Sequence, residues 1–139
     1  MEYKRFQDKY LVRLERGEEI VESIEKLAKK ENIRLGKVSG IGAVNKATIG
    51  LFKADTKEYK STELTGDMEI VNLTGNISEM DGEVYLHLHI ALGDDKYNLY
   101  GGHLNSATIS VTGELIIDVM EGQVDREYNE EIGLNLLKF

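Results

Sequence analysis

The chain has 139 residues, of which 41% are hydrophobic, and it carries a formal net charge of −8. This length and composition suit one domain with a buried core, so we expect residues 1–139 to form a single domain. The acidic balance argues against a protein that grips nucleic-acid phosphates, because that task needs Lys and Arg. Cysteine is absent, which excludes disulfides and thiolate metal sites. Neither a long apolar run nor a signal-type segment occurs, so we expect a cytoplasmic protein that does not enter a membrane.

One helix is predicted after a first strand at residues 10–14. Its apolar residues follow the i, i+1, i+4, i+7, i+8 spacing of a single buried stripe, namely Ile20, Val21, Ile24, Leu27 and Ala28. Acidic residues lie near its start and basic residues near its end, as the helix dipole favours. Gly17 is a candidate N-cap, and Asn32 is a candidate C-terminal stop.

Most of the remaining chain is predicted to form strands. Asp81-Gly82 is a hairpin signal, so residues 84–90 should pair antiparallel with residues 68–77. We expect an acidic connection over 125–131 and a last strand over 134–137. The sequence therefore predicts an α+β fold, with a mostly antiparallel sheet of about seven to eight strands and one main N-terminal amphipathic helix.

All three histidines of the chain lie in two short stretches, residues 84–90 and 101–103. In a strand, successive side chains point to opposite faces, so His87 and His89 share a face, with their Cα atoms about 6.6–6.8 Å apart. His103 follows two glycines and is a candidate third ligand. Three protein ligands with one open position is the usual arrangement of catalytic zinc.

Spacing alone leaves two interpretations open. The histidines either bind a metal ion or stand on a solvent-facing strand, where one of them hydrogen-bonds a carboxylate. If a metal is bound, Glu114 is the first candidate for a catalytic base or additional ligand, and Glu69 is the second.

Four segments together resemble a known family. They are SGIGAV (39–44), MEIVNLTGN (68–76), LHLH (86–89) and GGHL (101–104). Their order and spacing are similar to those of the plants-and-prokaryotes-conserved (PPC) domain, here as a stand-alone prokaryotic member. The resemblance extends from the first strand to about Met120.

The resemblance implies an α+β fold with an antiparallel sheet, assembled as a homotrimer. It also implies that His87, His89 and His103 bind a divalent metal ion, with zinc first among the candidates. In plants the domain accompanies AT-hook DNA-binding motifs. This chain has no AT-hook and no proline, and it is acidic, all of which argues against direct DNA binding.

Two functional hypotheses follow, beside a purely structural trimer with solvated histidines. The first is a metal-binding trimeric module with a regulatory or DNA-associated role. The alternative is a metal-dependent enzyme, a hydrolase or lyase that uses a water on the histidine-bound metal. A small-molecule ligand is compatible with both.

Overall fold

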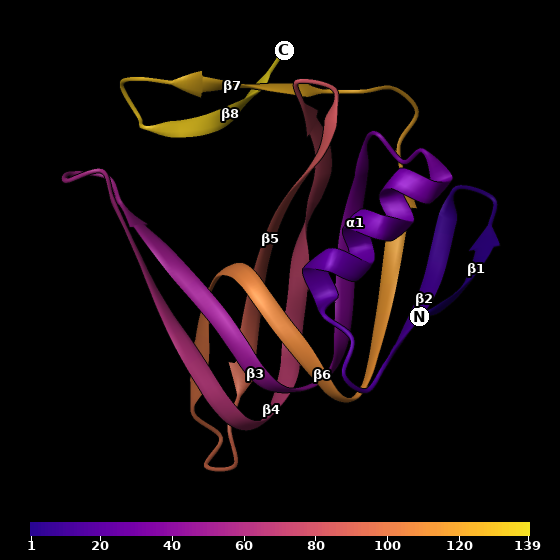
Figure 1. The fold of residues 1–139 in the computed structure, drawn as a ribbon, viewed down its shortest axis with the longest axis vertical. Coiled ribbons are helices and arrows are strands. Elements are labelled where there is room, and N and C mark those ends of the chain that lie inside the picture. Colours follow the sequence, from indigo (N-terminus) through magenta and orange to yellow (C-terminus); the bar gives the residue numbers. More distant parts are fainter.

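The computed structural model describes residues 1–139 as eight strands and one helix (Figure 1). Their bounds are β1 (Glu2–Phe6), β2 (Lys9–Glu15), α1 (Ile20–Glu31), β3 (Gly36–Lys53), β4 (Glu58–Met80), β5 (Glu83–Gly93), β6 (Leu99–Val119), β7 (Asp125–Asn129) and β8 (Leu134–Lys138). Every strand pairing is antiparallel, which confirms the predicted fold class. The helix does not have the length and apolar character of a membrane span.

Four long strands close on themselves. The main sheet has the order β1-β2-β6-β3-β4-β5, and β5 also pairs with the start of β6. The ring β6-β3-β4-β5 can close because its strands are long and bend at register shifts, where bulges increase local twist. The hairpin β7–β8 forms a separate two-stranded sheet, seen at the top of Figure 1 beside the β4–β5 turn.

Helix α1 begins at a glutamate cap. The side chain of Glu19 accepts the backbone N–H of Glu22, and its other oxygen accepts the N–H of Ala107 in β6. The prediction that Gly17 is the N-cap is therefore wrong, because a glycine has no side chain to accept these bonds. The helix ends as predicted at Asn32, which is left-handed with φ 53°.

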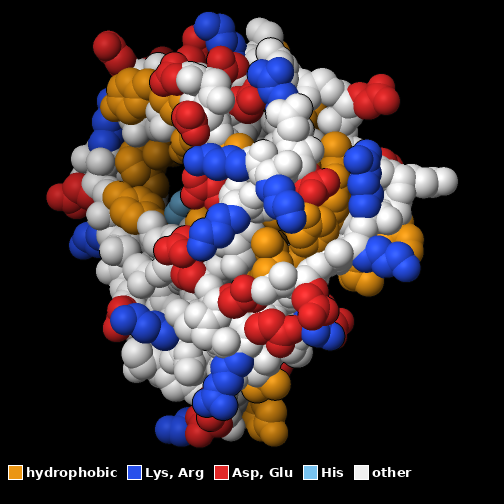
Figure 2. All heavy atoms as spheres, turned by 45° about the vertical axis from the view of Figure 1, so that its right-hand side comes forward, with side chains coloured by type: hydrophobic (Ala, Val, Ile, Leu, Met, Phe, Trp, Pro, Cys, Tyr) orange, Lys and Arg blue, Asp and Glu red, His pale blue; other side chains and the backbone are white.

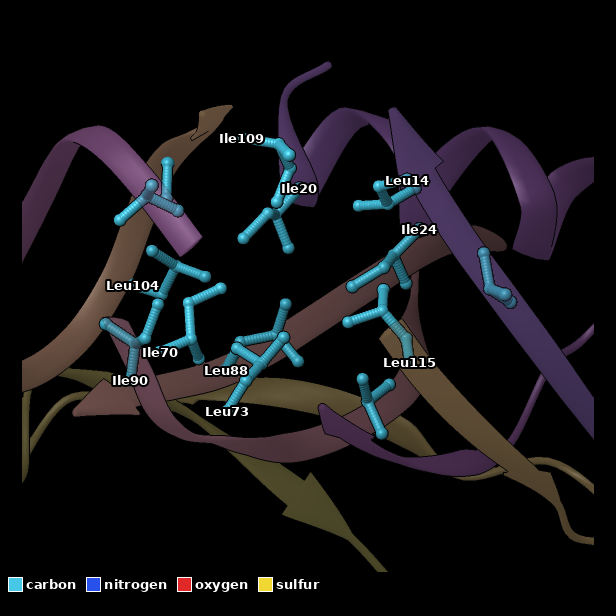
Figure 3. Packing of buried hydrophobic residues seen from close by; sticks show 14 of the residues in the cluster. Leu14, Ile20, Ile24, Ile70, Leu73, Leu88, Ile90, Leu104, Ile109 and Leu115 are labelled. Carbon is cyan, nitrogen blue, oxygen red and sulfur yellow. The ribbon is translucent and has the colours of Figure 1, made fainter. Parts of the chain in front are cut away.

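The core lies between α1 and the concave side of the strands. It contains 24 buried hydrophobic residues, drawn from α1, from strands β2 to β6 and from Ile33 between α1 and β3. Figure 3 shows Ile20 and Ile24 of the helix beside side chains of the sheet, among them Leu88 and Leu115. Full burial of one such side chain contributes about 1.5–3 kcal/mol. The core thus holds one face of β5 in place and leaves its other face for the site.

Several predicted elements differ from those observed. Strand β1 was not predicted, and the stretch 125–131 contains β7 rather than only a connection. The predicted strand 68–77 is part of a longer strand, β4, because pairing with β3 continues on both sides of Gly66. The Asp81-Gly82 turn and the pairing of β4 with β5 are confirmed.

A bulge in β4 interrupts the alternation of its side chains between the two faces of the sheet. Between Ile70 and Asn72 the register with β5 shifts by one residue, so the face of each later residue is exchanged. Leu73 is consequently buried in the core, whereas Thr74 and Asn76 lie opposite His89 and His87. The bulge thus places polar residues, not apolar ones, beside the histidines.

Gly75 supplies a test of this tight pairing. A Cβ at this position would lie 2.0 Å from the carbonyl oxygen of His87 and 2.8 Å from Cα of Leu88. We expect Gly75→Ala to reduce the free energy of unfolding by about 2 kcal/mol or more, since two backbones would have to separate. Urea denaturation followed by circular dichroism measures this change.

Gly93→Ala is the matched control in β5, because a Cβ there meets only side-chain atoms at ordinary distances of 3.5 Å and 3.6 Å. Equal stability of the two variants would contradict the described packing of β4 against β5.

Candidate metal centre

The three histidines of the chain converge. His87 and His89 extend from β5, and His103 extends from β6, where it is the register partner of His89. One ligand atom from each residue lies within 4.8 Å of the other two. The centres of the three rings are separated by 5.2, 5.3 and 5.6 Å. Pairing between β5 and β6 thus brings together side chains that are distant in sequence.

Burial of the opposite face of β5 directs its histidines outward. Leu88 and Ile90 are 1% and 3% exposed in the core, so the alternating residues His87 and His89 point away from it. His103 is positioned by a close approach of β6 to β3. A Cβ on the preceding Gly102 would lie only 2.6 Å from the carbonyl oxygen of Gly50.

The donor set suits a divalent transition-metal ion. Zinc–nitrogen bonds of about 2.0–2.1 Å place tetrahedral ligand atoms roughly 3.4 Å apart, so modest side-chain rotations close the observed cluster on an ion. His87 and His103 are half-buried and His89 is exposed. Figure 2 shows a histidine side chain inside a hollow, and hydrophobic side chains lie on the rim of that hollow. The three imidazoles therefore fit a metal that keeps one position open to a ligand.

The surroundings lower the pKa of two of the three imidazoles. Burial lowers the pKa of His87, and the neighbouring His103, Arg126 and His89 lower it further. Burial also lowers the pKa of His103, with an added contribution from His89. Neutral imidazole is the form that binds a metal, so these effects keep the site ready for one.

Tyr59 stands beside the cluster and was not predicted from the sequence. Its ring meets that of His103 edge-on at 6.2 Å between centres, and its hydroxyl donates to Oδ1 of Asn105 at 2.7 Å. The ring lies over Gly50, where a Cβ would be 1.9 Å from the tyrosine oxygen. An isolated glycine inside a strand pattern is the signal that indicates such a close approach.

Arg126 is a second neighbour that the sequence does not predict, because the residues of 125–131 indicate an acidic connection. Its guanidinium lies 4.6 Å from the centre of the Tyr85 ring and donates to Oγ of Ser78, Oδ1 of Asn76 and the carbonyl oxygen of Asn135. Burial lowers the pKa of Arg126, but an arginine stays charged in proteins. Strand β7 thus brings a cation to the histidine face.

The two carboxylates considered as bases lie elsewhere. Glu114 of β6 is opposite Arg13 of β2 and Ile41 of β3, and Glu69 of β4 is opposite Gly93. Neither belongs to the convergent group, which consists of the three histidines. A catalytic role for either residue stays a prediction.

Comparison with solved structures shows close likeness over nearly the whole chain. A protein from Bacteroides thetaiotaomicron, described provisionally as DNA-binding, is 39% identical with a TM-score of 0.97, covering 99% of this chain and 96% of that one. A metal-containing protein from Archaeoglobus fulgidus is 33% identical with a TM-score of 0.88, covering 99% and 97%. A plant- and prokaryote-conserved (PPC) protein from Pyrococcus horikoshii is 33% identical with a TM-score of 0.86, covering 99% and 94%.

Sequence comparisons also find relatives that match most of this chain. A curated relative, the bifunctional protein GlmU of a Synechococcus strain, is 31% identical over 128 residues, which is 89% of this chain but 19% of that protein. The chain thus spans about a fifth of the length of that relative. The profile of the Plants and Prokaryotes Conserved (PCC) domain, the same family as PPC, matches residues 1–121. The chain therefore belongs to the PCC domain family.

Proposed function

We propose that this protein is a homotrimeric PCC-domain module that binds one divalent metal ion per chain, zinc first, through His87, His89 and His103. The observation that carries the proposal is the convergence of these side chains, with one ligand atom from each within 4.8 Å of the others. A relative described as metal-containing, which is 33% identical over nearly the full chain, supports it.

Zinc is preferred over other ions because the site offers three imidazoles and no carboxylate. Magnesium and calcium favour oxygen ligands, whereas imidazole nitrogen suits zinc and its neighbours in the first transition series. A zinc ion held there would act as a Lewis acid toward whatever occupies its remaining position.

Trimer formation is supported by the apolar surface left on a single chain. On the hairpin β7–β8, Leu134 and Leu136 share one face of a strand and are 39% and 37% exposed, and Phe139 is fully exposed. Leu51 of β3 and Leu99 of β6 are 65% and 67% exposed. Large exposed apolar side chains at strand ends are typical of contacts between copies, and homo-oligomers normally close with cyclic symmetry.

A regulatory role that involves a DNA-binding partner fits the family better than direct contact with DNA. The net charge of −8 opposes phosphate binding. The alternative of a metal-dependent hydrolase or lyase is supported by the open coordination position that three protein ligands leave. It is weakened by the separation of Glu114 and Glu69 from the histidines.

Loss of a single histidine should abolish stable metal binding. Tag-free protein should retain close to one equivalent of metal by elemental analysis. We expect His87→Gln, His89→Gln and His103→Gln each to lower zinc affinity by more than the roughly 10–100-fold that loss of an outer partner costs. Lys4→Gln, on the edge strand β1, is the control. A protein that takes up no zinc, or variants that bind it as tightly as the wild type, would contradict the proposal.

The lowered pKa values give the site a defined response to pH. In metal-free protein, His87 and His103 should titrate below the ordinary histidine value of about 6.5, as followed by the ring proton resonances in NMR. The unfolded chain then binds more protons than the folded one, so metal-free protein should lose stability as pH falls below about 6.5. Midpoints at or above the ordinary value would be inconsistent with the half-buried cluster.

The molar mass of the protein in solution tests the proposed trimer. Multi-angle light scattering of the purified chain at micromolar concentration should give about 47 kDa, three times the 15.7 kDa of one chain. A mass near that of the single chain would rule out the trimer without affecting the metal proposal.

A further inference from the structure

Arg126 is a buried cation with no carboxylate partner. The residue is only 6% exposed, and the three hydrogen bonds of its guanidinium go to neutral oxygens of Ser78, Asn76 and Asn135. By contrast, Arg13 and Arg34 are more exposed and both pair with glutamates. Burying a charge without a counter-charge costs free energy of folding, and a residue that only packs would not incur that cost.

The guanidinium lies along the row that leads to the histidines. Its Nε contacts Ser78, which is opposite Tyr85, and its Nη2 contacts Asn76, which is opposite His87. Directly opposed side chains have Cβ atoms about 4.5–5.5 Å apart, so the charge is one row away from the nearest imidazole. Three of the five N–H groups of Arg126 have protein partners, which leaves one on Nη1 and one on Nη2.

Charge around the cluster is therefore unbalanced. The three imidazoles are neutral ligands and the convergent group contains no Asp or Glu. With a divalent ion bound, the site would carry the two charges of the metal and that of Arg126. We infer that the three-histidine centre takes a small anionic ligand, a carboxylate, and that Arg126 is the residue that selects for its charge. This inference rests on the proposed metal binding.

If Arg126 had a purely structural role, it would hold the hairpin β7–β8 against the main sheet. The hydrogen bonds to Ser78 and Asn76 do connect β7 to β4. That role needs hydrogen-bond donors but no charge, and a neutral amide supplies donors without the cost of a buried cation. The two roles are separable because only the selecting role distinguishes an anionic ligand from a neutral one.

The test uses protein loaded with Co²⁺, whose visible spectrum reports any new ligand on the metal. Acetate is the anionic probe and free imidazole is the neutral probe. In Arg126→Gln we expect acetate affinity to fall about tenfold or more, since a nearby unit charge is removed from a partly desolvated site. Imidazole affinity should change less than twofold. Arg126→Lys should keep most of the acetate affinity, and Arg34→Gln, which removes a guanidinium already paired with Glu79, is the matched control.

Asn76→Asp provides a second variant that keeps the guanidinium in place. The Asn76 oxygen is 3.0 Å from Nη2, so an aspartate of nearly the same shape would neutralise Arg126 without disturbing its packing. Acetate affinity should fall here as well, whether or not Arg126→Gln folds.

The outcomes separate the two proposals. If the wild type takes up no Co²⁺, the metal proposal fails. If Co²⁺ binds but acetate and imidazole affinities change in parallel, or neither changes in Arg126→Gln and Asn76→Asp, the selecting role of Arg126 is overturned while the metal site stands. A carboxylate of a second copy that neutralised Arg126 in a trimer would give that latter result.

Discussion

The pairing of β5 with the first residues of β6 is the constraint on which the rest of the structure depends. It closes the four strands into a ring and places His103 directly opposite His89. Because both strands bury their other faces in the core, neither can rotate the histidines inward without exposing apolar side chains. The energy of the hydrophobic core thus also holds the ligand geometry.

Close backbone contact makes that pairing possible. Gly50, Gly75 and Gly102 lie on three different strands behind or beside the cluster, and a Cβ at any of them would overlap neighbouring atoms. Tyr59 occupies the space above Gly50, so a glycine on one strand creates the position for an aromatic wall on the next. Small residues here serve the site by letting larger groups approach it.

The electrostatics of the site differ from those of the remaining surface. Overall the chain is acidic, and many of its surface charges form exposed ion pairs, which contribute little individually. The histidine face instead combines two imidazoles whose pKa values burial lowers, those of His87 and His103, with a buried guanidinium. A local positive site in a negative molecule does not gather anions through long-range attraction. Any preference for an anion must come from short-range contacts with the metal and Arg126.

Local patterns in the sequence determined the helix, the Asp81-Gly82 hairpin and the shared face of His87 and His89. These depend on neighbours within a few residues, where periodicity and turn chemistry decide the conformation. The two glycines before His103 made it a candidate third ligand, and the family resemblance supported the same set of three. The bulge before Asn72, the strand β7 and the approach of Arg126 came from the tertiary structure. Each depends on contacts between segments distant in sequence, because a one-residue shift of register or an added hairpin is stabilised by its partner strand rather than by its own residues.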